Sequence, residues 1–84
     1  MRTWGRWWLD LRPPVSLNIQ LFPNYIYWIP LSQCKTLQDR KLWLRHLATK
    51  RRELISVKDL RDLRMAFKDL FENSRAINVE NIRI

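Results

Sequence analysis

The residue types that most often carry catalysis or bind metal ions are sparse in this chain. Its 84 residues include one histidine, His46, and one cysteine, Cys34. A metal site needs several such ligands together, and a catalytic nucleophile needs a base within hydrogen-bond distance. No second histidine or cysteine is present to complete either arrangement. We therefore expect His46 to be a polar residue on the flank of a helix and Cys34 to be a small buried hydrophobe.

Paired carboxylates are the other route to catalysis, and Asp59, Asp62 and Asp69 are the candidates for it. They are interleaved with lysines and arginines between residues 58 and 68. Opposite charges three and four positions apart are typical of an exposed helix whose charges pair with one another. We predict that this helix is nearly neutral, that the protein is not an enzyme, and that it uses no cofactor, metal ion or small-molecule substrate.

Positive charge is the clearest chemical signal, because 16 Lys and Arg stand against 8 Asp and Glu and give a net charge of +8. Such a balance favours a polyanionic partner, either a nucleic acid or an anionic membrane. The excess is concentrated between residues 35 and 52, where Asp39 is the only acidic residue. A membrane surface, an acidic protein and simple solvation are the alternatives to phosphate. The residues predicted to bind RNA phosphates are Lys41, Arg45, Lys50, Arg51 and Arg52.

Tryptophan is the second unusual feature, with five in the chain. Trp4, Trp7, Trp8 and Leu11 follow the i, i+3, i+4, i+7 spacing of one helical face. The two prolines after residue 12 would end such a helix. We predict that residues 1–12 form a short helix that docks through Trp4, Trp7 and Trp8 on a partner protein, RNA or lipid. Packing of these rings on the protein's own hairpin is the alternative.

Residues 15–31 follow the two-residue period of a half-buried strand. Apolar and polar residues alternate from Val15 to Leu21, and residues 25–29 are rich in strand-favouring types. Pro23-Asn24 lies between them and indicates a turn. The pattern predicts a β-hairpin, and we expect Trp28 and Trp43 to lie in the core.

Two amphipathic helices are predicted next. Thr36 is the candidate N-cap of the first, and Asp39 in its first turn suits the helix dipole. Ser56 followed by Asp59 resembles a capping box at the start of the second. Residues 76–84 alternate loosely and predict a terminal strand that joins the hairpin or pairs with another chain. The apolar face of the second helix consists of Leu60, Leu63, Phe67, Leu70 and Phe71.

The predicted fold class is α+β, with a short N-terminal helix, a β-hairpin, two amphipathic helices and a C-terminal strand. The strands would form a small antiparallel sheet with the helices on one face. Residues 1–12 are the predicted docking segment, and residues 13–84 are predicted to form a single small domain.

No family motif matches the chain residue by residue. In its small size, basicity and tryptophan content it is similar to accessory subunits of large ribonucleoproteins, mitochondrial ribosomes among them. This resemblance implies a small non-catalytic subunit that contacts RNA phosphates and neighbouring protein subunits. Two alternatives remain. One is a protein-binding regulator or inhibitor of the kind found in viruses and phages, and the other is a peripheral subunit of a membrane complex.

The sequence also bears on the compartment. A single cysteine forms no internal disulfide, which favours a reducing, intracellular location. Prolines and amides interrupt the most apolar stretch, residues 15–31, so we expect no membrane-spanning helix. The N-terminus lacks the apolar run of a secretory signal. Its arginines at positions 2, 6 and 12 weakly resemble a mitochondrial presequence.

Overall fold

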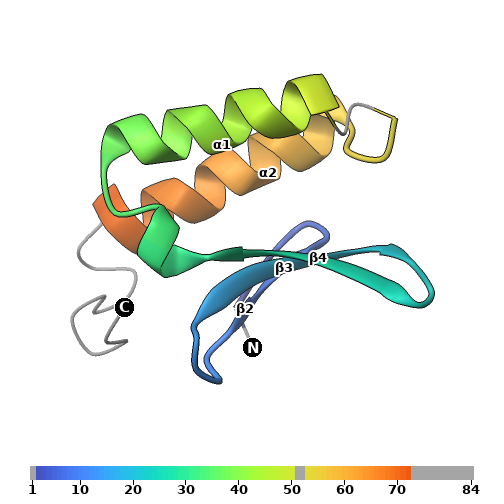
Figure 1. The fold of residues 1–84 in the computed structure, drawn as a ribbon, viewed down its shortest axis with the longest axis horizontal. Helices are drawn as coiled ribbons and strands as arrows, with labels where there is room; N and C mark the ends of the chain where they lie inside the picture. The colour runs from blue at the N-terminus through green and yellow to red at the C-terminus, as the bar shows by residue number, and fades with distance from the viewer. Residues whose placement is uncertain (1, 51–52, 73–84) are drawn as a thin grey trace.

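A computed structural model of the protein describes residues 2–50 and 53–72. A four-stranded antiparallel sheet comes first in the chain, and two helices follow and cover one face of it (Figure 1). The α+β class predicted from the sequence is thus correct in general. The strands, in their order across the sheet, are β1 (Thr3–Trp4), β2 (Trp7–Asp10), β3 (Ser16–Phe22) and β4 (Tyr25–Pro30). After them come the 3-10 turn η1 (Leu31–Gln33), the helices α1 (Leu37–Lys50) and α2 (Val57–Phe67), and the π-helical turn η2 (Lys68–Glu72).

The predicted N-terminal helix is wrong, because residues 3–10 form the hairpin β1–β2. Gly5 has a φ of +61°, which a helix does not allow and which a two-residue hairpin turn requires. A Cβ atom at this position would also collide with the carboxylate of Asp62. The three tryptophans therefore do not share one face. Trp4 pairs with Trp7, which is buried, and Trp8 lies on the opposite face of the sheet.

Residues on both sides of the predicted boundary at residue 12 belong to the same sheet. β2 pairs with β3 along its whole length, from Trp7 opposite Ile19 to Asp10 opposite Ser16. The predicted C-terminal strand, residues 76–84, lies outside the described residues. In the described part of the chain no strand follows the helices, so the partners of the predicted hairpin come from the N-terminal side.

The hairpin predicted for residues 15–31 is confirmed as β3 and β4. The two strands pair from Ser16 opposite Pro30 to Phe22 opposite Tyr25, around the turn at residues 23–24. Their alternation places one set of side chains toward the helices and the other set on the uncovered face of the sheet. Asn18 lies on the uncovered face between Trp8 of β2 and Trp28 of β4.

The hydrophobic core lies between the covered face of the sheet and the helices. α2 packs on β1 and β2, and α1 packs beside α2. Leu63 and Phe67 are fully or almost fully buried, so the apolar face predicted for the second helix is confirmed at these two positions. Trp28 was expected in the core, but its side chain points to the uncovered face and is 50% exposed. Trp43 is half-buried at the edge of the core.

Candidate nucleic-acid interface

The start of α2 is fixed by the capping box that the sequence predicted. The Ser56 hydroxyl accepts a hydrogen bond from the Asp59 amide over 3.1 Å, and the Asp59 carboxylate accepts one from the Ser56 amide over 3.0 Å. The reciprocal bonds satisfy two of the free amides at the helix N-terminus. They also fix the side of the helix on which Asp59 lies.

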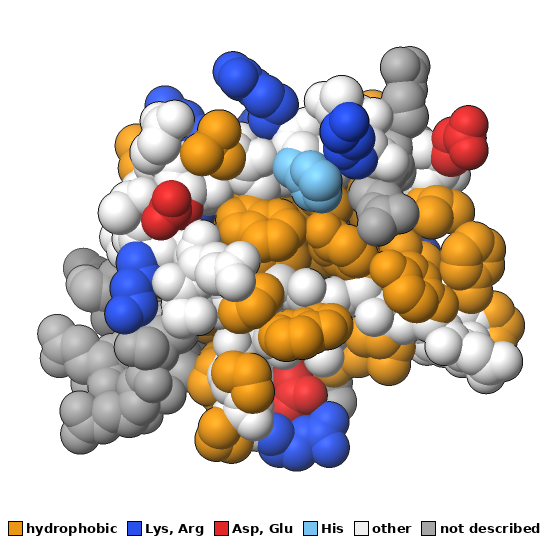
Figure 2. Space-filling view, in the orientation of Figure 1, with side chains coloured by type: hydrophobic (Ala, Val, Ile, Leu, Met, Phe, Trp, Pro, Cys, Tyr) orange, Lys and Arg blue, Asp and Glu red, His pale blue; other side chains and the backbone are white. Residues whose placement is uncertain are grey.

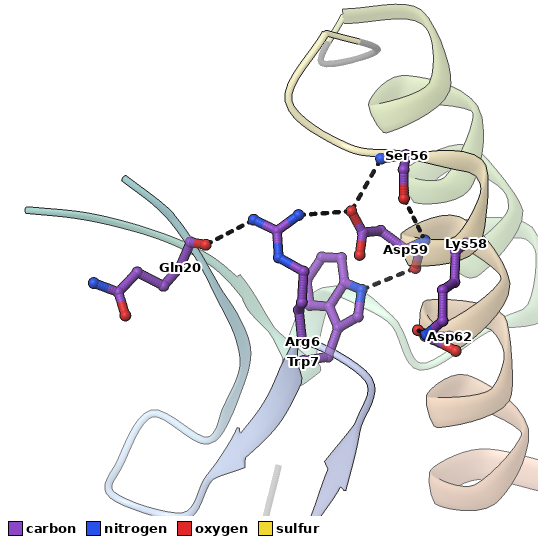
Figure 3. A network of polar contacts seen from close by, with 7 residues as sticks. All are labelled: Arg6, Trp7, Gln20, Ser56, Lys58, Asp59 and Asp62. Carbon is purple, nitrogen blue, oxygen red and sulfur yellow. Dashed lines mark hydrogen bonds and ion pairs between the residues drawn. The ribbon is translucent and has the colours of Figure 1, made fainter. Parts of the chain in front are cut away.

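That side faces the β1–β2 hairpin, and Asp59 joins the hairpin to the helix (Figure 3). Its carboxylate accepts a hydrogen bond from the Arg6 guanidinium over 2.8 Å, and its side chain is only 4% exposed. The same guanidinium also donates to the carbonyl of Gln20 over 2.9 Å. The Trp7 indole donates to the Asp59 carbonyl over 2.9 Å. Asp59 is therefore a structural residue whose charge is compensated from the sheet.

The other two aspartates of this segment are also engaged. Asp69 accepts a hydrogen bond from the Trp4 indole over 2.8 Å and lies 3.6 Å from the Arg2 guanidinium. Asp62 pairs with Lys58 over 2.8 Å, the one ion pair along the helix itself among the described residues. The prediction that the charges of this helix mainly pair with one another is thus wrong for Asp59 and Asp69, which pair with the N-terminal strands.

The cations on the opposite side of α2 and η2 consequently stay uncompensated. Arg61, Arg64 and Lys68 are exposed and make no ion pair within the described residues. Their spacing of i, i+3 and i+7 places them on one helical face. These three residues are not among the predicted phosphate-binding residues, because opposite charges three and four positions apart along a helix normally pair with one another. Their spacing along the sequence was the feature that indicated a shared helical face.

The predicted phosphate-binding residues of α1 are exposed as well. Lys41, Arg45 and Lys50 lie on the surface of the helix and make no side-chain ion pair in the part of the chain that the structure describes. The remaining two predicted residues, Arg51 and Arg52, lie outside the described residues.

Arg40 belongs to the same basic run but has a structural role. It is 7% exposed, and its guanidinium donates to the carbonyls of Cys34 and Lys35 over 2.8 and 2.9 Å. It also lies over the ring of Phe71, 4.7 Å from the ring centroid, and so links α1 to the end of the second helical segment. A buried guanidinium held in this way is not available to phosphate.

Both sets of exposed cations lie on the helical layer of the protein. The helices run side by side (Figure 1), and the guanidinium of Arg40 in α1 lies over the ring of Phe71 in η2. Lys41 follows Arg40 directly, and Arg64 lies two helical turns before Phe71. Figure 2 shows basic side chains over α1, away from the sheet. We call the surface that carries the exposed cations of α1, α2 and η2 the outer helical surface. Its residues are Lys41, Arg45, Lys50, Arg61, Arg64 and Lys68.

The predicted docking tryptophans occupy three different environments. Trp7 is fully buried in the core, and Trp4 is half-buried with its indole bound to Asp69. Trp8 is half-buried on the uncovered face of the sheet. Of the three rings, only that of Trp8 lies on a face that no helix covers, and the more exposed tryptophan is Trp28.

The remaining chemical candidates are Cys34 and His46. Cys34 is fully buried, and burial raises the pKa of its thiol to about 12. His46 is exposed and packs edge-on against Trp43, with ring centroids 5.9 Å apart. Over residues 2–50 and 53–72, no three His, Cys, Asp or Glu side chains gather where they could hold a metal ion. Within the same ranges, no helix has the length and apolar character needed to cross a membrane.

Comparisons with known proteins add no family to this picture. No family model, no curated protein and no solved structure matches the chain.

Proposed function

We propose that the protein binds RNA through the outer helical surface, as a small non-catalytic subunit of a ribonucleoprotein. The observation that carries this proposal is the segregation of charge around α2. Asp59 and Asp69 are bound to the β1–β2 hairpin, while Arg61, Arg64 and Lys68 on the other side have no carboxylate partner among the described residues. Together with the cations of α1, they form a surface suited to a row of phosphates.

An RNA partner accounts for this surface better than a membrane. A helix that lies in a membrane interface needs an apolar face to insert into the acyl region. The apolar faces of α1 and α2 instead pack into the protein's own core, at Leu47, Leu63 and Phe67. The exposed apolar residues of these helices are scattered among the cations. Arginine and lysine on a polar surface suit phosphates, which need charge and hydrogen bonds rather than insertion.

The proposed setting is a reducing, intracellular compartment, mitochondria among the candidates, with neighbouring protein subunits as further partners. A single buried thiol is compatible with such a compartment. A protein-binding regulator is the second candidate function, and the observation that favours it is the apolar, uncovered edge of the sheet at β4.

The test is the salt dependence of RNA binding. If about five phosphates are neutralised, log K falls with log salt at a slope of roughly −3.5 on single strands and more steeply on a duplex. Replacing Arg61, Arg64 and Lys68 together with Gln should weaken binding to unrelated RNAs equally and flatten the slope by about two units. Lys58→Gln is the matched control, since Lys58 is paired with Asp62. It should leave the slope almost unchanged.

Two results would contradict the proposal. RNA binding by the wild type that barely responds to salt would mean that phosphates are not the main contacts. Flotation of the protein with anionic vesicles, together with no measurable RNA binding, would favour the membrane alternative. A circular dichroism melt of the triple variant must match that of the wild type, because all three side chains are solvent-exposed.

A further inference from the structure

The two edges of the sheet are very different. Among residues 2–50 and 53–72, β1 is an edge strand of two residues, whereas β4 is an edge strand of six residues, Tyr25–Pro30. Natural proteins usually protect a long edge with lysines or other charges, which prevent another strand from pairing with it. β4 carries no charged residue, and none occurs anywhere from Pro13 to Cys34. In a chain with a net charge of +8, this is a long neutral stretch.

The backbone of β4 has bonding groups that point away from the sheet. The Leu31 amide donates to the Val15 carbonyl over 3.0 Å, so these two residues form a hydrogen-bonded pair. Bonded and non-bonded pairs alternate along an antiparallel ladder, so Tyr27 bonds to β3 while Ile26 and Trp28 do not. The amides and carbonyls of Ile26 and Trp28 therefore point outward from the edge.

The side chains along this edge are apolar on both faces of the sheet. Ile26 and Trp28 lie on the uncovered face and are 46% and 50% exposed. Tyr25, on the face toward the helices, is 39% exposed. Figure 2 shows hydrophobic side chains gathered on the viewed face from the sheet up to α1, with Lys and Arg at its margins. An uncharged edge with exposed apolar side chains is a template for strand addition.

We infer that β4 pairs with β4 of a second copy of this chain, antiparallel and about a two-fold axis at Tyr27. In this register Ile26 of each copy lies opposite Trp28 of the other, and Tyr27 lies opposite itself. Ile26 of one copy and Trp28 of the other then exchange two backbone hydrogen bonds, as the members of a bonded pair do. The side-chain pairs are aromatic with β-branched or aromatic with aromatic, the combinations that stabilise neighbouring strands.

Other symmetric registers fit less well. An axis at Trp28 would place Pro30 opposite Ile26, and proline has no amide to donate. An axis at Ile26 would place Asn24, a residue of the hairpin turn, opposite Trp28. The sequence Tyr25-Ile26-Tyr27-Trp28-Ile29 is self-complementary only about its centre, because that register alone pairs every residue with a strand residue of the same face. This self-complementarity identifies a second copy as the occupant.

Charge favours the same assignment. Two chains of +8 repel one another wherever their cations approach. The edge of β4 is neutral, whereas the six cations of the outer helical surface lie on the helical segments. A two-fold axis perpendicular to the sheet keeps both helical layers on the same face of the joined sheet. The two outer helical surfaces would then form one larger basic surface, a consequence that rests on the proposed function.

The association therefore has a diagnostic response to salt. Screening reduces the repulsion between the two basic layers, so salt should strengthen the dimer, whereas it weakens binding to phosphates. These opposite signs separate the two proposals. The dimer can be measured with no RNA present, and its failure leaves the RNA proposal standing.

The test is sedimentation equilibrium of the protein without nucleic acid, at low and high salt. The wild type should show a mass approaching twice the 10.4 kDa of one chain as concentration rises. Ile26→Lys places a charge on the edge of β4 and should leave a monomer at all concentrations. Thr3→Lys is the matched control, because Thr3 is exposed on β1, at the opposite edge. It adds the same charge and should dimerise as the wild type does.

A monomeric wild type at every concentration and salt would overturn the inference, and so would equal loss of the dimer in both lysine variants. Cross-linking is a second test that does not depend on whether the Ile26→Lys protein folds. Tyr27→Cys should form a symmetric disulfide on mild oxidation, since the two-fold axis passes beside it. Thr3→Cys should not, and the native Cys34 is buried and does not interfere. Failure of a folded Tyr27→Cys protein to cross-link would contradict the register.

Discussion

The two hairpins of the sheet differ in what holds their side chains. The β1–β2 hairpin is bound to the helices by directed contacts, including the indoles of Trp4 and Trp7 and the guanidinium of Arg6. The far end of the β3–β4 hairpin is as rich in aromatic residues but leaves its large side chains exposed. Its exposed large side chains are Phe22, Tyr25, Ile26 and Trp28.

Similar aromatic residues in one small sheet thus have different structural roles. A buried tryptophan is costly to leave without a partner for its N–H group, and Trp7 has one in the Asp59 carbonyl. Trp28 has neither burial nor a hydrogen bond from its ring among the described residues. We interpret the first hairpin as structural and the edge of the second as a surface for contacts with other molecules.

The largest expected effect separates Trp7 from Trp28. Trp7→Ala removes a fully buried ring and should cost about 3–5 kcal/mol of the free energy of unfolding, which would abolish cooperative folding in so small a protein. Trp28→Ala removes a half-exposed ring and should cost about 1 kcal/mol or less. Urea denaturation measured below the concentration of dimer formation tests both. Equal costs would mean that the contrast between the hairpins is wrong.

A smaller effect tests the attachment of the first hairpin. Asp59→Ala removes the capping carboxylate and the partner of Arg6, and should lower the free energy of unfolding by about 2 kcal/mol. Asp62→Ala is the control, because Asp62 pairs with an exposed lysine and such pairs contribute about 0.5 kcal/mol. If both substitutions have the same small effect, the contacts of Asp59 do not hold the hairpin to α2.

The elements with strong local signals could be predicted from the sequence. The β3–β4 hairpin has alternating residues and a proline turn, and α2 has both its capping box and its apolar face. The N-terminal strands could not be predicted from the spacing of Trp4, Trp7 and Trp8, because that spacing matches the period of a helix rather than that of a strand. The single glycine was the deciding residue, because a positive φ at Gly5 ends any helix there.

The candidate site was only partly predictable for a related reason. The exposed cations of α1 follow from a run of like charge, which is visible along the chain. Those of α2 are mixed with aspartates, and their effect depends on which side of the helix each carboxylate occupies. Whether a carboxylate pairs with these cations depends in turn on its tertiary partners, such as Arg6 for Asp59 and Trp4 for Asp69, which lie far away in the sequence. A count of neighbouring charges does not contain this information.

The smallest expected effect concerns the end of β4 rather than its edge. Cys34 lies just after η1, is fully buried, and its thiol donates weakly to the Pro30 carbonyl over 3.6 Å. Burial raises the pKa of this thiol from 9.0 to about 12, so the folded protein keeps it protonated. In the unfolded chain it ionises as the pH passes 9, and ionisation there favours unfolding.

The stabilising contribution of this thiol is therefore complete below about pH 9 and is lost between that pH and about 12. At pH 9, where half of the unfolded thiol is ionised, the loss amounts to about 0.4 kcal/mol. Subtracting the pH profile of Cys34→Ala from that of the wild type removes the titration of lysines and tyrosines. If the difference between the two pH profiles stays flat from pH 8 to 10, or if the native thiol is alkylated rapidly, the end of β4 is exposed to solvent like its edge. A sloping difference with slow alkylation would confine the open surface to the edge.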